Sequence, residues 1–198
     1  MGLAAYNPFI GQHIKDQAGG SVDHGFIAHY QIAAADAVAA GAANVAPATI
    51  LANGLTTTLT TADITQPPTP RVLSITGNAA TAVGNVVVTG TDANGDELIE
   101  TIVSTGAATV LGTKAFASIV TIVLPARGAV ADSISVGLSD RFGLPYMLPH
   151  NTVILILNNA TVTTVAAGSS FSGTVLADNF IDPTAALNAA QVDVYLIV

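Results

Sequence analysis

From residue 71 onward, short runs of apolar and β-branched residues alternate with clusters of Gly, Asn, Asp and Pro. Valine, isoleucine and threonine favour strands, and the residues between the runs favour turns. Many short strands at close spacing are typical of antiparallel sandwiches and barrels. The pattern therefore predicts an all-β fold, an antiparallel β-sandwich or barrel with an extended N-terminal arm. The expected strands lie within residues 71–77, 84–92, 97–105, 113–125, 133–138, 151–159, 160–168, 169–178 and 191–198.

Two of these runs indicate which side of the strand faces a core. In residues 133–138 (SISVGL), Ile134 and Val136 fall on one face and serines fall on the other. Successive side chains of a strand point to opposite faces, so this alternation predicts one buried face. In residues 191–198 (QVDVYLIV) the residues expected on one face are Val192, Val194, Leu196 and Val198.

The sequence DANGD at residues 92–96 separates two predicted strands. An Asn-Gly pair between β-rich runs is the strongest short-range signal for a hairpin, and it favours a type I′ turn. Such a turn needs a positive φ, which glycine adopts without steric cost. We therefore expect a hairpin at Asn94-Gly95, with Gly95 required for its conformation.

The first 70 residues have a different pattern. Residues 1–25 mix Gly, Asn, Pro, Gln and Asp without core periodicity, and we expect an arm that contacts a neighbouring subunit. Residues 26–33 and 56–61 are predicted strands. The alanine-rich residues 34–48 are expected to form a short helix or an irregular loop. Residues 66–70 (QPPTP) are expected to be a stiff linker, because proline removes donors and fixes φ.

A chain of 198 residues can bury a core without disulfides or metals. We expect three parts, namely the arm at residues 1–25, a connecting segment at 26–70 and a β-sandwich domain at 71–198. There is no cysteine, so disulfides and thiolate metal sites are excluded.

Charged residues make up only 9% of the chain, hydrophobic residues make up 51%, and the mean hydropathy is +0.60. The apolar residues are too interrupted for a membrane-spanning helix, and the first residues lack the basic and apolar regions of a signal peptide. No membrane partner is therefore expected. A surface with so little charge is typical of one covered by neighbouring protein chains.

The net charge is −8, with five Lys and Arg residues in total. Nucleic-acid binding requires a basic surface, so direct contact with nucleic acid is not expected.

The sequence offers little that could support catalysis or metal binding. A carboxylate group within residues 92–100 could suggest calcium, but its glycine is misplaced for an EF-hand loop, and a polar hairpin turn is the favoured interpretation. The members of that group are Asp92, Asn94, Asp96, Glu97 and Glu100. The histidines are His13, His24, His29 and His150, and none has zinc-site spacing. No nucleophile motif or dinucleotide loop is present. We therefore expect no catalytic residue, no cofactor and no metal, and not an enzyme.

Several segments resemble a family of tailed-bacteriophage virion structural proteins, over roughly residues 26–198. The most specific is RFGLPYMLPHNTV at residues 141–153. The other segments that carry the resemblance are residues 71–102, 112–125, 132–153 and 192–198.

The resemblance implies a structural virion protein of the capsid decoration (cement) type, made in the host cytoplasm and located on the capsid surface. Its implied partners are the major capsid protein and further copies of itself, as a homotrimer. A neck, tail-tube or head-fibre component remains an alternative, and a carbohydrate- or surface-binding module is less favoured because the chain has no tryptophan and 5% aromatic residues.

Overall fold

A computed structural model describes residues 14–15, 21–22 and 25–198. The described chain is almost entirely β, and every strand pair is antiparallel, as the sequence predicted. Within these ranges the one helical element is the 3-10 turn η1 (Leu176–Asp178). No helix among them has the length and apolar character needed to cross a membrane. The strands are β1 (Ile14–Lys15), β2 (Ser21–Val22), β3 (Ile27–Ile32), β4 (Gly41–Ile50), β5 (Thr57–Thr60), β6 (Arg71–Gly77), β7 (Val83–Thr91), β8 (Glu97–Thr105), β9 (Val110–Phe116), β10 (Ser118–Leu124), β11 (Ser133–Gly143), β12 (Val153–Asn158), β13 (Thr161–Thr163), β14 (Phe180–Ile181) and β15 (Val192–Ile197).

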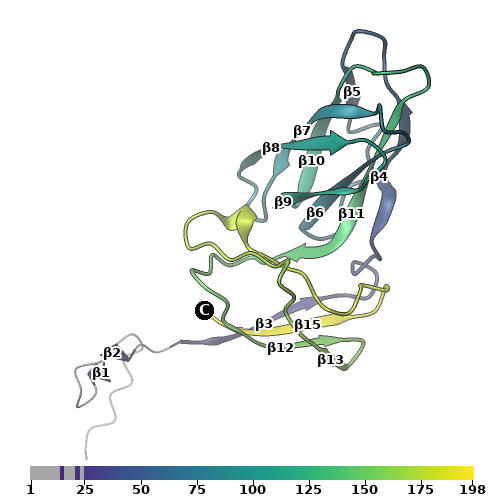
Figure 1. Ribbon diagram of the computed structural model, residues 1–198. Coiled ribbons are helices and arrows are strands. Elements are labelled where there is room, and N and C mark those ends of the chain that lie inside the picture. The colour runs from purple at the N-terminus through teal and green to yellow at the C-terminus, as the bar shows by residue number, and fades with distance from the viewer. Residues whose placement is uncertain (1–13, 16–20, 23–24) are drawn as a thin grey trace, which may run out of the picture.

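Two of the sheets form a sandwich, which is the first of the two predicted architectures. One sheet has the strand order β5-β10-β7-β8, and the other has the order β14-β11-β6-β9 with β4 also paired to β11. Figure 1 shows the two layers facing each other. Aliphatic side chains fill the space between them, among them Leu73, Val88, Ile102, Ile122 and Val136.

A third sheet, with the order β13-β12-β15-β3, lies below the sandwich in Figure 1. It covers a second hydrophobic core, which includes Ile156, Val194 and Leu196. Strand β11 joins the two cores, because Ile134 packs in the sandwich core and Phe142 packs in the second core. Residues 26–70 supply β3 to the third sheet and β4 and β5 to the sandwich.

The alanine-rich segment at residues 34–48 was predicted as a helix or a loop, and this was wrong for its second half. Residues from Gly41 onward form β4, which pairs with β11 at the edge of its sheet. Val45 and Ala46 are buried in the sandwich core, so packing outweighs the helix propensity of alanine. Pro47 is tolerated because the register with β11 shifts there, and edge strands accept proline at such irregularities.

The strand predicted within residues 169–178 was also wrong. This segment holds the 3-10 turn η1, and its strand-type pairing is an isolated bridge between Ser170 and Phe180. The side chain of Asn179, fully buried, accepts from the Ser172 backbone N–H and donates to the carbonyls of Ser172 and Val175. These local bonds give the backbone an alternative to a strand ladder.

The Pro-rich segment at residues 66–70 contains no strand, but it is anchored to the sandwich. The amide of Gln66 donates to the carbonyl of Ile119 and accepts from its N–H, both at 2.8 Å. The side chain thereby replaces a strand partner where the β10–β7 register shifts between Ile119 and Thr121.

The hairpin at residues 92–96 is confirmed, but its turn is not type I′. Gly95 has a φ of 87°, whereas Asn94 does not have a positive φ. The Gly95 N–H donates to the carbonyl of Asp92, as in a type I turn followed by a left-handed residue. Asp92 Oδ1 accepts from the backbone N–H groups of Asn94 and Asp96, which holds the loop closed.

Replacing Gly95 by valine is expected to lower the free energy of unfolding by about 1–2 kcal/mol, because a β-branched residue is strained at positive φ. Thermal unfolding measures this change. Gly95→Asn is the control, since asparagine visits the left-handed region more readily and is expected to lose less. Equal stability of the valine variant and the parent would contradict the turn assignment.

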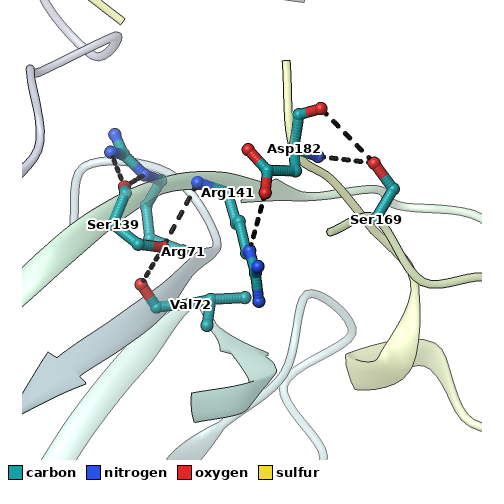
Figure 2. Close-up of polar contacts among 6 residues, drawn as sticks. All are labelled: Arg71, Val72, Ser139, Arg141, Ser169 and Asp182. Carbon is teal, nitrogen blue, oxygen red and sulfur yellow. Dashed lines mark hydrogen bonds and ion pairs between the residues drawn. The ribbon is translucent and has the colours of Figure 1, made fainter. Parts of the chain in front are cut away.

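A cluster of polar contacts holds the end of β11, where the strand leaves the sandwich (Figure 2). The β11–β6 register shifts between Leu138 and Phe142, so the carbonyl of Ser139 lacks a ladder partner. The guanidinium of Arg71 donates to that carbonyl through Nε at 3.0 Å and through Nη2, and donates to the carbonyl of Val38 at 2.8 Å. Arg71 is fully buried, and burial lowers its pKa to about 10, which leaves it charged at neutral pH.

Candidate interaction surface

The third sheet presents one buried face and one outer face. Its inner side chains, such as Val192, Val194 and Leu196 of β15, are fully buried in the second core. Because side chains alternate along a strand, the intervening residues point outward. Val198 was expected to share the buried face, but it lies beyond β15 and is 44% exposed.

The strand register places the outer side chains in rows across the sheet. One row contains Leu155, Tyr195 and His29, and the next contains Leu157, Asp193 and Gln31. Val162 of β13 extends the second row and is 66% exposed. A third row contains Ile197 and Ile27, the latter 70% exposed. We call this set the outer sheet face.

The outer sheet face is apolar along β12 and β13 and in its Ile27–Ile197 row, and it is polar around His29 and Gln31 of β3. The four strands carry one charged residue, Asp193. Exposed apolar area with so little charge is typical of the core of a protein–protein interface.

Asp193 is held in a fixed position by amide and imidazole groups. Its Oδ1 accepts from Gln31 Nε2 at 3.0 Å and lies 2.8 Å from His29 Nε2, and its Oδ2 accepts from Gln191 Nε2 at 2.9 Å. The hydrogen bond from Gln31, followed by those from Gln191 and His29, holds the pKa of Asp193 below its ordinary value. The imidazole of His29 stacks on Tyr195, with ring centroids 4.6 Å apart and planes 5° apart. The carboxylate is therefore an oriented acceptor within an otherwise uncharged surface.

A pocket of about 560 Å³ adjoins the Ile27–Ile197 row of the outer sheet face. Residues of the segment 145–152 form one wall, and Ile197 and Val198 form the other. No Asp, Glu, Lys or Arg side chain lines it, and we call it the apolar pocket.

The structure separates the residues of the candidate calcium group. Asp92 binds the backbone of its own turn, as described above. Glu97 is exposed, whereas Glu100 is buried on the opposite face of β8 and accepts from the backbone N–H and Oγ1 of Thr113. Over the described ranges, no three His, Cys, Asp or Glu side chains are grouped so that they could hold a metal ion.

Burial raises the pKa of Glu100, and this outweighs the bonds from Thr113 and the nearby charge of Lys114. A carboxyl whose folded-state pKa is raised stabilises the fold at pH values below its unfolded pKa, and this contribution is lost as the pH rises. At pH 7 the fold therefore carries the cost of a buried carboxylate.

Replacing Glu100 by glutamine is expected to raise the melting temperature at pH 7, because the variant has no buried charge. The difference between variant and parent should shrink as the pH falls toward 4, where the parent carboxyl becomes protonated. Melting curves from pH 4 to pH 8 measure how the melting temperature of each protein depends on pH. Parallel pH dependence of the two proteins would show that Glu100 titrates as it does in the unfolded chain.

The histidines are not brought together by the described structure. His29 lies on the outer sheet face beside Asp193, and His150 lines the apolar pocket. His13 and His24 lie outside the described residues, as does most of the arm predicted at residues 1–25.

The partners of Asp193 were not found from the sequence. Residues 26–33 and 191–198 were both predicted as strands, but nothing local indicates that they pair across 160 residues or more. Comparison with protein-family models, with curated proteins and with solved structures found no match in any of the three.

Proposed function

We propose that this chain is a non-enzymatic structural protein of a tailed-bacteriophage virion, which binds the outside of the capsid and stabilises the shell as a decoration protein. Its partners are the major capsid protein and further copies of itself, arranged as a homotrimer. The outer sheet face supports this role more than any other observation, because it offers apolar side chains around a single oriented carboxylate. The sequence segments that resemble tailed-bacteriophage virion proteins support the proposal that the particle is a phage virion.

Protein partners fit the outer sheet face better than small molecules do. The face is a surface of alternating residues from adjacent strands, and a protein partner could cover several of its rows at once. Asp193 would fix how the partner is aligned on this face, because an acceptor held in one position favours the alignment that brings a donor of the partner to it. The sandwich holds this face at one end of the molecule through the continuous strand β11 (Figure 1).

The copy number of the chain in purified particles tests the proposed function. Calibrated gel densitometry against the major shell protein is expected to give a ratio near one to one, as a lattice-wide decoration protein requires. A small fraction would instead indicate a neck, tail or vertex-fibre component. Absence of the chain from the particle would refute the virion role.

Replacing Val162 by aspartate tests the outer sheet face as the contact surface. The side chain is 66% exposed, so the fold should keep its melting temperature, while binding to particles that lack the protein should weaken at least about tenfold because a charge is buried at the contact. Val130→Asp is the matched control, since Val130 is 81% exposed in the loop between β10 and β11. Loss of binding in the control alone would assign the contact to the sandwich instead.

A further inference from the structure

Strand β8 ends one sheet of the sandwich, and its outer edge is open (Figure 1). Its ladder with β7 covers nine residues without a register shift, which is the longest unbroken ladder of any edge strand in the described ranges. No strand of these ranges pairs with the other side of β8. An edge of this kind presents a row of backbone N–H and C=O groups to any strand that can reach it.

The register shows which backbone groups of β8 face outward. The N–H of Asp92 donates to the carbonyl of Asp96, so these residues form a hydrogen-bonded pair where the ladder starts. Hydrogen-bonded pairs alternate along an antiparallel ladder, so the even-numbered residues of β8 bond to β7. The carbonyl of Thr91 agrees with this alternation, because it accepts from the N–H of Ala117 on the β10 side of β7. The odd-numbered residues of β8 therefore direct their backbone groups away from the sheet.

The other edge strands of the two sandwich sheets are protected against pairing, and β8 is not. Strand β9 carries Lys114, its register with β6 shifts, and the side chain of Glu100 binds one of its backbone N–H groups. Strand β5 has four residues, and Asp63 accepts from the N–H of Thr60. Lysines, bulges and short strands are devices that keep edges from pairing. Strand β8 has no lysine, proline or bulge, and its one outward charge, Glu97, is its first residue.

The side chains along the open edge are apolar or neutral. Ile99 is 52% exposed and Val103 is 53% exposed, with the exposed Thr101 between them. The four strands of this sheet hold two charged residues, Glu97 and Glu100, and the second points inward. A strand added to β8 would therefore extend an almost uncharged outer surface.

The sequence of β8 is complementary to itself in one antiparallel register. A two-fold axis at Thr101 places Ile99 opposite Val103 of a second copy. The same axis places Glu97 opposite Thr105, so that all nine residues of each strand are paired. Apolar side chains at directly opposite positions stabilise a ladder. The backbone groups that face outward also meet in this register, because odd-numbered residues pair with odd-numbered residues.

Charge and length favour this register over the neighbouring ones. With the axis at Thr101, the inward Glu100 lies opposite Ile102 of the second copy. An axis at Glu100 would bring two Glu100 carboxyls directly opposite each other, and like charges at such positions are destabilising. An axis at Ile102 would leave Glu97 and Leu98 without partners in the strand.

We propose that β8 is a self-association edge, at which the β8 strands of two copies pair antiparallel about a two-fold axis at Thr101. Thr101 of each copy donates its N–H to the carbonyl of Thr101 in the other. The contact joins the two sheets into one continuous sheet and closes both open edges. It shares no residue with the outer sheet face, and it does not depend on a role in a virion.

A single introduced cysteine tests the contact, because the chain has no cysteine of its own. The axis brings the two Thr101 Cα atoms to about 5.5 Å, which is within the reach of a disulfide. The full chain with Thr101→Cys is expected to form a disulfide-linked dimer under mild oxidation, seen on a non-reducing gel. Thr58→Cys is the matched control, since Thr58 is exposed on β5 at the opposite edge of the same sheet. Equal dimer yields from the two variants would overturn the proposal.

Sedimentation equilibrium of the full chain gives a second measurement that does not depend on cysteine chemistry. The parent is expected to self-associate, and Thr101→Lys should weaken this association at least about tenfold, because it places two like charges opposite each other at the axis. Thr58→Lys should leave the association unchanged. A parent that does not associate, or an association that Thr101→Lys leaves intact, would refute the β8 contact.

Two double variants test the register itself. Ile99→Lys combined with Val103→Glu places opposite charges across the contact and should retain the association. Ile99→Lys combined with Val103→Lys places like charges there and should lose it. Both side chains are about half exposed, so both variants should fold, and their melting temperatures check this. Equal loss of association in both would show that residues 99 and 103 do not face each other.

Discussion

Replacing Arg71 by alanine is expected to lower the free energy of unfolding by about 4 kcal/mol. The substitution leaves the carbonyls of Ser139 and Val38 without their donor, at about 1–3 kcal/mol for a buried group. It also leaves a cavity where a fully buried side chain stood, and large-to-small changes in cores cost about 2–5 kcal/mol. For a chain of this length the melting temperature should fall by about 10 °C.

Two further variants separate the causes of this loss. Arg71→Met keeps most of the volume but no donors, so it should recover the cavity part and not the hydrogen-bond part. Arg141→Ala is the matched control, since Arg141 pairs with Asp182 at 3.0 Å but keeps partial exposure, and such pairs contribute about 1 kcal/mol or less. If Arg71→Ala cost no more than Arg141→Ala, the carbonyl of Ser139 would not depend on the guanidinium.

Replacing Gly137 by alanine is expected to cost about 3 kcal/mol or more. A Cβ at this position would overlap the carbonyl oxygen of Gly41, where β4 crosses β11. The obstacle is backbone, so β4 must move away from the sheet and Val45 must leave its place in the core. Overpacking of this kind destabilises by about 1–3 kcal/mol, and occasionally more when backbone shifts.

Gly54→Ala is the control for Gly137→Ala. Gly54 has a φ of 68°, and a Cβ at this position would meet no atom within 4 Å, so alanine there should cost only the backbone strain of about 1–2 kcal/mol. Urea unfolding of both variants measures the difference. If Gly137→Ala lowered the free energy of unfolding no more than Gly54→Ala does, β4 would be able to move away from β11 without destabilising the fold.

The strands that local pattern could predict are those with strong β-propensity between clear turn residues. Residues 71–77 and 97–105 were predicted with the same bounds as β6 and β8. The assignment of Ile134 and Val136 to the core is also confirmed, although the serines on the other face of β11 are buried as well. Propensity and alternation are local properties, so they succeed where local and tertiary preferences agree.

The errors lie where distant contacts decide the structure. Gly137 and Gly41 permit the close crossing that makes β4 a strand, and neither glycine reveals this locally. The side chain of Asn179 holds residues 169–178 in a turn by hydrogen bonds to their backbone, and the pattern of apolar residues gives no sign of these bonds. The outer sheet face depends on the pairing of β3 with β15, which only the assembled fold shows.

The pairing of β3 with β15 also bears on the order in which the protein is made. Ile32 lies opposite Val192 and Ile27 opposite Ile197, so this ladder closes loops of about 160 residues, and the loop entropy must be overcome before its contacts form. The sandwich strands leave the ribosome earlier and can fold first. The outer sheet face cannot exist until residues 192–197 have been synthesised. A chain without residues 192–197 therefore lacks the surface that we propose for assembly, and it would not compete for a place on the particle.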